Sequence, residues 1–329
     1  MLHPVPIEND AVRIEVWPGL GGKVSSIIDK ADKFELLFNF PDELPTEPQY
    51  DIPYTHSWYA GWDECFPAVG PGPYVGHPYN AVNVPDHGEL WGIPTIAVPT
   101  KDGITTVWNG LRFGYRLTRK LSLDGPSIHA RYTLVNTAPF PFRFVWAQHA
   151  LMSWAANAPV EIQLPAGTMM RVSHDSQGRE SNEWFTWPTC DKPELDFSQL
   201  HGLPPKQGWK LFSMDKISTP AIVRYPSRGR EVAISYSGSA AKPGALAPGP
   251  SGAATNNDAD DDDDKDTSPP VDAYWGVWIN TGGWSAHHHF AIEPTTGRFD
   301  QLDRAVKDAS AGTVGPSGQV TWSLTWTLR

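Results

Sequence analysis

The stretch HHHFAIEPTTG at residues 287–297 brings three histidines close to a single glutamate. If it forms a β-strand, alternation places Glu293 and His289 on one face and Phe290 and Ile292 on the other. A carboxylate and an imidazole on one face can exchange protons with a bound substrate, which is general acid–base chemistry. The plainer interpretation is an exposed carboxylate at a strand edge, because glutamate usually lies at the surface.

The same stretch does not predict a metal site. Alternation divides the histidines of 287–289 between two strand faces, and no zincin-type spacing accompanies them. Pro294 cannot continue a central strand and Gly297 suits a turn, so we expect the strand to end at Glu293, with its carboxylate facing solvent or a cleft. We therefore expect neither a metal ion nor another cofactor.

Two further histidines lie in segments whose composition suits a site. His87 belongs to PDHGELWG, residues 85–92, beside two acidic residues and a glycine. His149 lies in VWAQHALMSW, residues 145–154, on an otherwise apolar strand face. A buried structural histidine is the plainer interpretation of His149. The ordinary pKa of histidine near neutrality also suits a general acid or base.

The elements that would position these residues are mostly strands. Helical periodicity is scarce, whereas short alternating segments are common, as in AVRIEVWP at residues 11–18 and GQVTWSLTWTLR at 318–329. Residues 104–154 predict a series of short strands with turns at Asn109-Gly110 and Asp124-Gly125. Many strands with few helices predict an all-β protein, a single large antiparallel β-sandwich domain over residues 1–329.

Two segments interrupt this pattern. Residues 40–85 are rich in proline, glycine and aromatic residues and show little periodicity, so they predict a long irregular loop, and such loops are often functional. Residues 237–272 are of low complexity and acidic, and they contain too few apolar residues to form a core. We expect them to form an insertion in a hairpin between the strands EVAISYS and YWGVWIN.

Composition excludes several classes of function. The chain of 329 residues carries a formal net charge of -11, much of it in DADDDDDKD at 258–266, and no basic stripe predicts a nucleic-acid partner. The two cysteines, Cys65 and Cys190, do not form a disulfide framework, and the N-terminus does not resemble a signal peptide, so we expect a cytoplasmic protein. No segment approaches the roughly 18 apolar residues of a membrane span.

Four segments, taken in chain order, resemble the galactose mutarotase-like superfamily, which includes the aldose 1-epimerases. They are PGLGGKVSSIID near the N-terminus, GWDECFPAVGPGPYVGHPYNAVNVPDHGELWG around His87, WAQHALMSW around His149 and FAIEPTTGRFDQL around Glu293. The resemblance implies the supersandwich fold of this superfamily. It also implies an isomerase that interconverts the anomers of a sugar without a cofactor, with Glu293 as general base, His149 as general acid and His87 as a second histidine beside the sugar ring.

Anomer interconversion requires that a base remove the proton of the C1 hydroxyl and that an acid protonate the ring oxygen. A carboxylate base and a protonated imidazole acid require an environment that holds their pKa values apart. Tryptophan can stack on the apolar face of a sugar, and carboxylates can accept hydrogen bonds from its hydroxyls. The expected sugar-binding residues are Asp63, Glu89, Trp91, Trp62 and His289.

The chain departs from the superfamily at two places that concern the substrate. HGELW lacks the arginine that suits a phosphosugar, and GPYVGHPYNAVNVPD lacks the arginine found before the first histidine in galactose mutarotases. We therefore expect an unphosphorylated monosaccharide or the terminus of a sugar chain as the partner. Asp175, Asp191 and Asp196 are each candidates for the additional mid-chain sugar-binding aspartate of the superfamily.

Two alternatives stay open, because a fold alone does not define an activity. One is a non-catalytic carbohydrate-binding or sensor protein. The other is a polysaccharide lyase or hydrolase on a related sandwich, which would need an additional catalytic carboxylate or tyrosine in the same cleft. In an epimerase, His149 and Glu293 should lie on opposite sides of one sugar-sized pocket, whereas in a binding protein one of them should point away.

Overall fold

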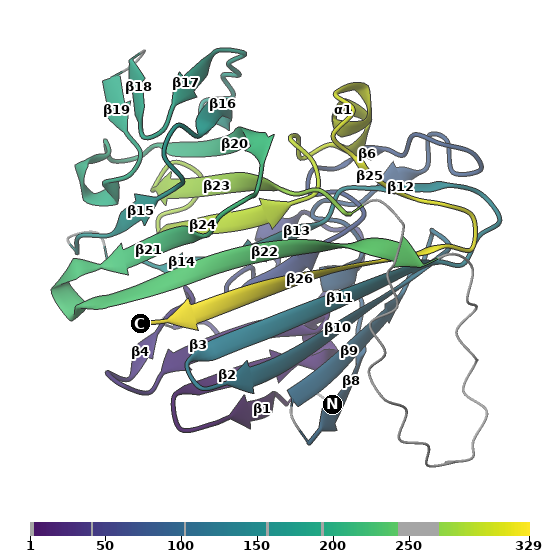
Figure 1. The fold of residues 1–329 in the computed structure, drawn as a ribbon, viewed down its shortest axis with the longest axis horizontal. Helices are drawn as coiled ribbons and strands as arrows, with labels where there is room; N and C mark the ends of the chain where they lie inside the picture. Colours follow the sequence, from purple (N-terminus) through teal and green to yellow (C-terminus); the bar gives the residue numbers. More distant parts are fainter. Residues whose placement is uncertain (1–2, 41, 102, 156–157, 192–193, 243–269) are drawn as a thin grey trace.

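The computed structural model describes residues 3–40, 42–101, 103–155, 158–191, 194–242 and 270–329. Within them, two large antiparallel sheets of 12 and 8 strands stack face to face, which confirms the predicted all-β sandwich (Figure 1). In spatial order the larger sheet consists of β1 (Val5–Glu8), β2 (Val12–Trp17), β3 (Lys23–Asp29), β5 (Trp62–Cys65), β13 (Ala147–Ala150), β24 (His288–Thr295), β23 (Tyr274–Thr281), β20 (Gly208–Lys216), β16 (Met169–Asp175) and β17 (Trp184–Thr186), with β4 (Phe34–Glu35) beside β3 and β14 (Met152–Ser153) beside β24.

The smaller sheet covers one face of the larger one. In spatial order it consists of β15 (Glu161–Gln163), β21 (Ala221–Tyr225), β22 (Arg230–Lys242), β26 (Gln319–Leu328), β11 (Ser127–Asn136), β10 (Tyr115–Asp124), β9 (Gly103–Asn109) and β8 (Ile96–Thr100). Three short ribbons lie outside the two sheets: β6 (Gly72–Pro73) with β7 (Asn83–Val84), β12 (Phe142–Phe144) with β25 (Gly312–Val314), and β18 (Thr189–Asp191) with β19 (Glu194–Asp196). The helical segments are α1 (Leu302–Lys307) and the single 3-10 turns η1 (Pro18–Leu20), η2 (Tyr54–His56), η3 (Leu90–Gly92), η4 (Leu200–Gly202) and η5 (Pro226–Arg228).

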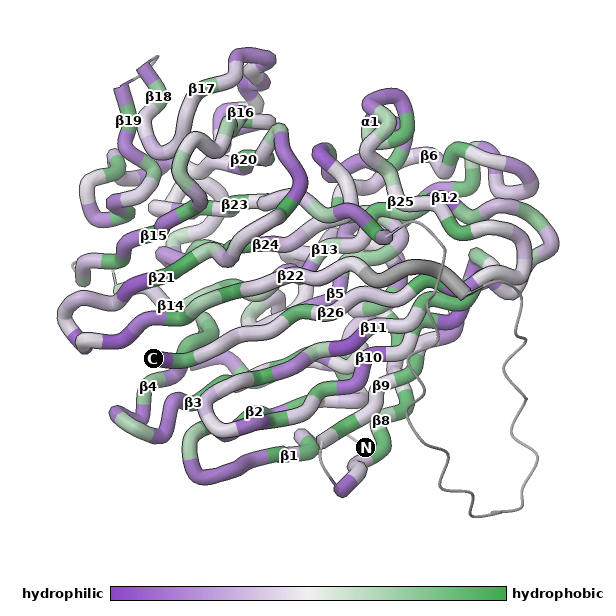
Figure 2. Tube along the Cα trace, viewed as in Figure 1, coloured by the Kyte–Doolittle hydropathy of each residue, from purple (hydrophilic) through white to green (hydrophobic). Residues whose placement is uncertain are grey.

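Alternation of apolar and polar residues forms the core between the sheets. In β26, Trp322, Leu324 and Trp326 are buried, whereas the serine and the threonine between them are partly exposed. Figure 2 shows the same alternation along the strands of the sandwich and hydrophilic residues in the short strands β18 and β19. This two-residue period explains why the strand class could be predicted from the sequence.

The core also contains a buried ion pair that joins the two sheets. Arg119 of β10 donates from Nη1 to Glu64 of β5 at 2.9 Å, and both side chains are fully buried. Glu64 also accepts hydrogen bonds from Trp62 at 2.9 Å, Tyr132 at 2.9 Å and Trp146 at 2.8 Å. These neutral donors compensate the carboxylate for the loss of water, as a buried charge requires.

Two details differ from the sequence-based expectation. The region 40–85 is not irregular throughout, because it contains β5, a central strand of the larger sheet. The strands on either side of the predicted insertion do not form a hairpin, because β22 belongs to the smaller sheet and β23 to the larger one. β22 also continues to Lys242, so residues 237–242 belong to a strand, and residues 243–269 lie outside the described residues.

We predict that Arg119→Met destabilises the protein by about 3–5 kcal/mol, because it leaves the Glu64 carboxylate buried without its cation. Urea unfolding measures the free energy. The matched control is Lys120→Met, at the exposed next position of β10, which should change stability by no more than about 0.5 kcal/mol. A loss below about 1 kcal/mol for Arg119→Met would contradict a structural role for the pair.

Candidate active site

The residues that could do chemistry lie on the face of the larger sheet that points away from the smaller one. Strand register places Asp63 of β5 opposite His149 of β13, and Gly276 of β23 opposite Glu293 of β24. Ala147 pairs with Thr295, so antiparallel pairing also sets His149 beside Glu293. The sheet therefore brings together in one row three of the residues that the sequence suggested.

His149 and Glu293 face each other directly. Nε2 of His149 lies 3.9 Å from Oε1 of Glu293, and its Nδ1 lies 3.5 Å from the hydroxyl of Tyr54. Burial lowers the pKa of His149 well below 6.5, and the positive charges of His87 and Lys210 act in the same direction. The imidazole is therefore neutral at neutral pH, which corrects the expectation of a protonated imidazole in the resting site.

Glu293 has a fully buried carboxylate. Its Oε2 forms an ion pair with Nζ of Lys210, and its Oε1 has no hydrogen-bond partner among the described residues. Burial raises the pKa of Glu293, and Lys210 opposes this effect. The expectation that the strand ends at Glu293 is wrong: β24 continues to Thr295, with Pro294 opposite Trp275.

Asp63 repeats this arrangement on the other side of His149. Its Oδ2 accepts hydrogen bonds from Nζ of Lys23 and from the hydroxyl of Tyr54, the latter at 2.6 Å. Its Oδ1 is buried and has no hydrogen-bond partner within the described part of the chain. Lys23 also donates to the carbonyl of Ala60 at 2.9 Å. Each of the two acids is thus held by one lysine through one oxygen, and its second oxygen is free to accept a hydrogen bond.

His87 reaches the site from the loop before η3. Its ring stacks on Tyr54 with 3.8 Å between ring centroids and lies perpendicular to His149 at 5.0 Å. Its Nδ1 lies 2.9 Å from Oδ1 of Asp86. Gly88 follows with φ of +77°, and a Cβ there would lie 2.1 Å from the carbonyl oxygen of Phe66. The loop can pass this close to β5 only with glycine, which explains the His-Gly pair.

Three of the five expected sugar-binding residues are packed against other parts of the protein and do not lie in the row of Asp63, His149 and Glu293. Trp62 lies between the sheets, stacked on Trp326 with 5.8 Å between ring centroids, so it belongs to the core. Glu89 is fully buried and accepts hydrogen bonds from Tyr50, Tyr115 and two backbone amides, so it is an anchor for loops. Trp91 is buried against the edge of Tyr54 and donates to the backbone of Asp86, which supports the Tyr54–His87 stack.

His289 does lie on the same strand face as Glu293, four residues before it in β24. Its Nδ1 accepts a hydrogen bond from Nε1 of Trp278 at 3.2 Å, so this nitrogen carries no proton. Burial lowers the pKa of His289 to about 3, and the neighbouring His287 and His288 act in the same direction. His289 is therefore a neutral acceptor that orients Trp278.

The structure adds residues that sequence reasoning missed. Lys210 lies in β20 within GWKLF, where a single lysine interrupts an apolar strand, and this was the available signal. Its Nζ lies 3.6 Å from Oδ1 of Asp300, whose Oδ2 lies 3.9 Å from His174. The acid beside Glu293 in space is thus Asp300, not one of the three mid-chain candidates. Asp175 is bound by Arg179, Asp196 is bound by Ser198, and Asp191 lies in the ribbon strand β18.

An aromatic pair lies next to Lys210. Trp278 of β23 pairs with Lys210 in the sheet, and its ring stacks on Trp284 with 3.9 Å between ring centroids. The ring of Trp284 lies over Gly208, where a Cβ would approach it to 2.2 Å. The ring of His174 lies 5.9 Å from that of Trp284. A flat, partly exposed surface of this kind can bind the apolar face of a ligand.

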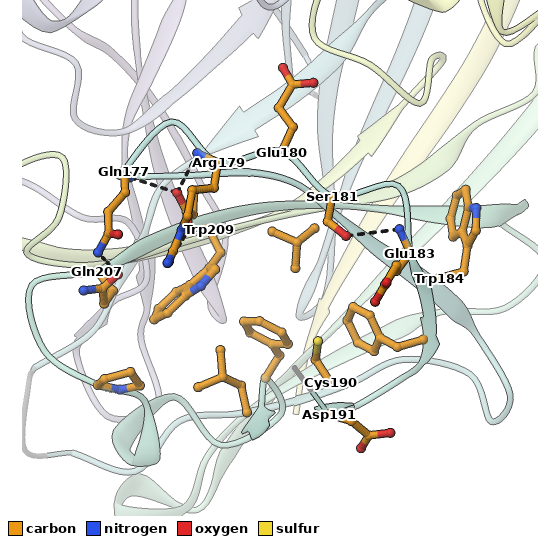
Figure 3. Close-up of a pocket in the computed structure, with 16 residues that line it drawn as sticks. Gln177, Arg179, Glu180, Ser181, Glu183, Trp184, Cys190, Asp191, Gln207 and Trp209 are labelled. Atoms are coloured by element: carbon orange, nitrogen blue, oxygen red, sulfur yellow. Dashed lines mark hydrogen bonds and ion pairs between the residues drawn. The ribbon is translucent and has the colours of Figure 1, made fainter. Parts of the chain in front are cut away.

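A pocket of about 640 Å³ opens elsewhere, on the other face of β16 and β20 (Figure 3). Its walls include Val172 and Trp209, whose side chains alternate with those that face Glu293. Its polar groups interact with one another: Asp175 binds Arg179, and Gln177 donates to Gln207 at 3.3 Å. The lining of this pocket does not include His87, His149 or Glu293, so it is separate from the candidate active site.

Two further findings concern only the part of the chain that the structure describes. No group of three or more histidine, cysteine, aspartate or glutamate residues there is arranged to hold a metal ion. No helix in the same residues is long and apolar enough to cross a membrane.

Comparison with known proteins identifies the fold. No family model matches the sequence, and no curated protein matches it either. Among solved structures, the Slr1438 protein of Synechocystis matches with a TM-score of 0.68 and 14% identity, over 100% of this chain and 96% of that one. Galactose mutarotase-like proteins of Lactobacillus casei (TM-score 0.66, 13% identity, 99% and 100% covered) and Clostridium acetobutylicum (0.62, 13%, 99% and 95%) also match. The chain has the galactose mutarotase-like fold, as the resemblance in sequence predicted.

The neutral state of His289 predicts how stability depends on pH. Its pKa is about 3 in the folded protein against 6.5 ordinarily, so below pH 6.5 the unfolded chain binds a proton that the folded protein does not. Its contribution to stability is present above pH 6.5 and is lost as the pH falls toward 3. The unfolding free energy of the wild type should therefore rise with pH in this range. Between about pH 4 and 6, His289→Gln should lower the slope of the unfolding free energy against pH by roughly 1.4 kcal/mol per pH unit.

Urea unfolding at several pH values measures this slope. His201→Gln, at an exposed position, controls for the general effect of replacing a histidine. Equal slopes for the wild type and His289→Gln would show that His289 binds its proton equally in both states, contrary to the geometry.

Proposed function

We propose that this protein is an aldose 1-epimerase-like enzyme that interconverts the anomers of an unphosphorylated sugar. The observation that carries the proposal is the pair formed by His149 and Glu293, with 3.9 Å between Nε2 and Oε1 on neighbouring strands. Oε1 of Glu293 is buried without a hydrogen-bond partner among the described residues, so a hydroxyl group of a substrate would satisfy it.

In the proposed reaction, Oε1 of Glu293 takes the proton of the C1 hydroxyl. The C1–O bond of the ring breaks as a carbonyl forms at C1, and negative charge develops on the ring oxygen. His149 gives its Nε2 hydrogen to that oxygen, with its Nδ1 toward Tyr54. Rotation about C1–C2 and the reverse transfers close the ring on the other face, so that both residues regain their starting states.

The neutral imidazole has a consequence for this mechanism. A neutral histidine polarises an oxygen by donating a hydrogen bond, and it transfers the proton only as charge develops on the acceptor. Because the neutral ring carries its one hydrogen on Nε2, Nδ1 is an acceptor, and the hydroxyl of Tyr54, which also contacts Asp63, lies close enough to donate to it. As the Nε2 hydrogen moves to the ring oxygen, Tyr54 would give its hydrogen to Nδ1, so that His149 stays neutral, and both hydrogens return when the ring closes.

The charges of the site favour a sugar without a phosphate or carboxylate group. Asp63, Glu293 and Asp300 supply three carboxylates, and the buried lysines that contact them are Lys23 and Lys210. With His149 neutral, the balance of this cluster is negative, and it stays negative when His87 and its partner Asp86 are included, so an anionic substrate would be repelled. The stacked pair of Trp278 and Trp284 offers an apolar surface to the ring of a neutral sugar.

Of the two alternatives, a polysaccharide lyase would use a tyrosine near the histidine, and Tyr54 lies in that position. Burial and the charge of Asp63 raise the pKa of Tyr54 well above 10, so its hydroxyl is a poor base at neutral pH. This does not favour the lyase. A binding protein in which one of the two residues points away is not favoured either, because Glu293 and His149 face each other. At 3.9 Å, however, they lie side by side, which corrects the expectation that in an epimerase they lie on opposite sides of a sugar-sized pocket.

We predict that Glu293→Gln reduces turnover of the cognate aldose by roughly 100-fold or more, because it removes the proton acceptor but keeps the shape. Sugar binding should weaken far less, because glutamine still accepts a hydrogen bond. His149→Asn should act similarly, and the double variant should lose much less than the product of the two. His288→Ala is the control, because His288 directly precedes His289 in β24 and its side chain lies on the face opposite to Glu293.

Polarimetry or NMR on freshly dissolved aldoses measures the rate. Near-normal rates for Glu293→Gln would refute its role as the base. If no aldose is converted while sugars still bind, the protein is a sugar-binding protein instead.

We further predict that Trp284→Ala weakens the affinity for the sugar roughly tenfold, which corresponds to about 1.4 kcal/mol, because it removes the outer ring of the stacked pair. Trp284→Phe should retain most of the affinity. Trp184→Ala is the matched control, because Trp184 is also partly exposed but lines the separate pocket of Figure 3. Calorimetric titration measures the affinity, and equal loss in both alanine variants would contradict a specific stacking role.

A further inference from the structure

We propose that Lys210 is a positioning residue that keeps Glu293 ionised, and that Asp300 limits how strongly it does so. The inference rests on the proposed function, in which Glu293 accepts a proton. It adds to that function a residue that sets the charge state of the base.

The geometry places Lys210 between the two acids. Its side chain is buried, and its Nζ contacts Oε2 of Glu293 and lies 3.6 Å from Oδ1 of Asp300. Lys210 is the third residue of β20, between Trp209 and Leu211, whose side chains point to the opposite face. Oδ1 of Asp300 is buried and, within the described residues, has no hydrogen-bond partner, so its charge is available to act on the lysine.

The groups around Glu293 explain why this lysine has the largest effect of any charged neighbour on the carboxylate. Burial favours the uncharged carboxyl, as in any fully buried acid. On β5, burial raises the pKa of the Cys65 thiol well above 9, so it adds no charge. On β13, His149 is neutral because of its burial. His87 approaches from its loop and lies beside Asp86, and it lowers the pKa of Glu293 less than Lys210 does.

Lys210 therefore supplies the positive charge in direct contact with Glu293, and it stays charged. Burial opposes its charge, but Glu293 and Asp300 outweigh burial and raise the pKa of Lys210 above 10.5. Asp300 acts on Glu293 in the opposite sense, because one carboxylate near another favours the protonated form. The other buried lysine, Lys23, contacts Asp63 and so cannot take over this role.

Two variants should therefore move the pH profile in opposite directions. Lys210→Met removes the charge and nearly keeps the length, and it should move the acidic limb of kcat/KM up by about one pH unit or more. At a fixed pH on that limb, the rate should be about tenfold lower for each pH unit by which the limb moves, and it should recover at higher pH. Asp300→Asn removes the opposing carboxylate and should move the same limb down. Lys216→Met, at an exposed position of the same strand, is the control and should leave the profile unchanged.

A readout that does not need turnover separates this inference from the proposed function. Infrared difference titration detects the protonated carboxyl band of Glu293, which is assigned by its loss in Glu293→Gln. In Lys210→Met this band should appear at higher pH than in the wild type, and in Asp300→Asn at lower pH, whether or not an aldose is converted.

Unchanged midpoints in a folded Lys210→Met would overturn the inference, and so would movement of both variants in one direction, which indicates a merely structural effect. If Lys210→Met does not fold, Asp300→Asn decides, because it retains the lysine: a lower midpoint supports the inference and an unchanged one overturns it. Failure of the proposed function alone would leave the changes in the infrared titration in place.

Discussion

The pairing of buried carboxylates with buried cations is the constraint on which both faces of the larger sheet depend. Strand alternation in β5 sends Glu64 into the core and Asp63 to the opposite face, so two neighbouring residues bring two charges out of water. Each is tolerable only because a cation meets it, Arg119 for Glu64 and Lys23 for Asp63. The first pair fixes the two sheets to each other, and the second fixes one side of the candidate site.

The site inherits its rigidity from this arrangement. Asp63, His149 and Glu293 come from adjacent strands, so their spacing follows from sheet register rather than from a loop. The loops add Tyr54 and His87, which stack on each other and close over the histidine of β13. The enclosure removes water from His149 and makes its imidazole neutral. The same packing that orders the pair thus also sets its protonation state.

The sequence allowed prediction of the features that depend on local period. β26 and the two faces of β24 follow from alternation, and the order of motifs located His87, His149 and Glu293. Features that depend on distant partners could not be predicted. Nothing near Trp62 or Glu89 in sequence indicates that Trp326 and Tyr115 would enclose them. β22 and β23 look like a hairpin locally, yet they pair with strands of different sheets.

The comparison with solved structures also separates the strand pattern, which local sequence determines, from the side chains of the candidate site. A likeness at 14% identity with a TM-score of 0.68 shows that very different side chains satisfy one pattern of strands. In such a pattern, one residue of β20 must share the sheet face of Glu293. The pattern does not require that this residue be a lysine. In this chain it is Lys210, and its contact with the carboxylate places a fixed positive charge at the oxygen opposite to the one that faces His149. If Lys210 acts as we propose, the choice of residue at such positions, and not the scaffold, adjusts the acid–base properties of the candidate site.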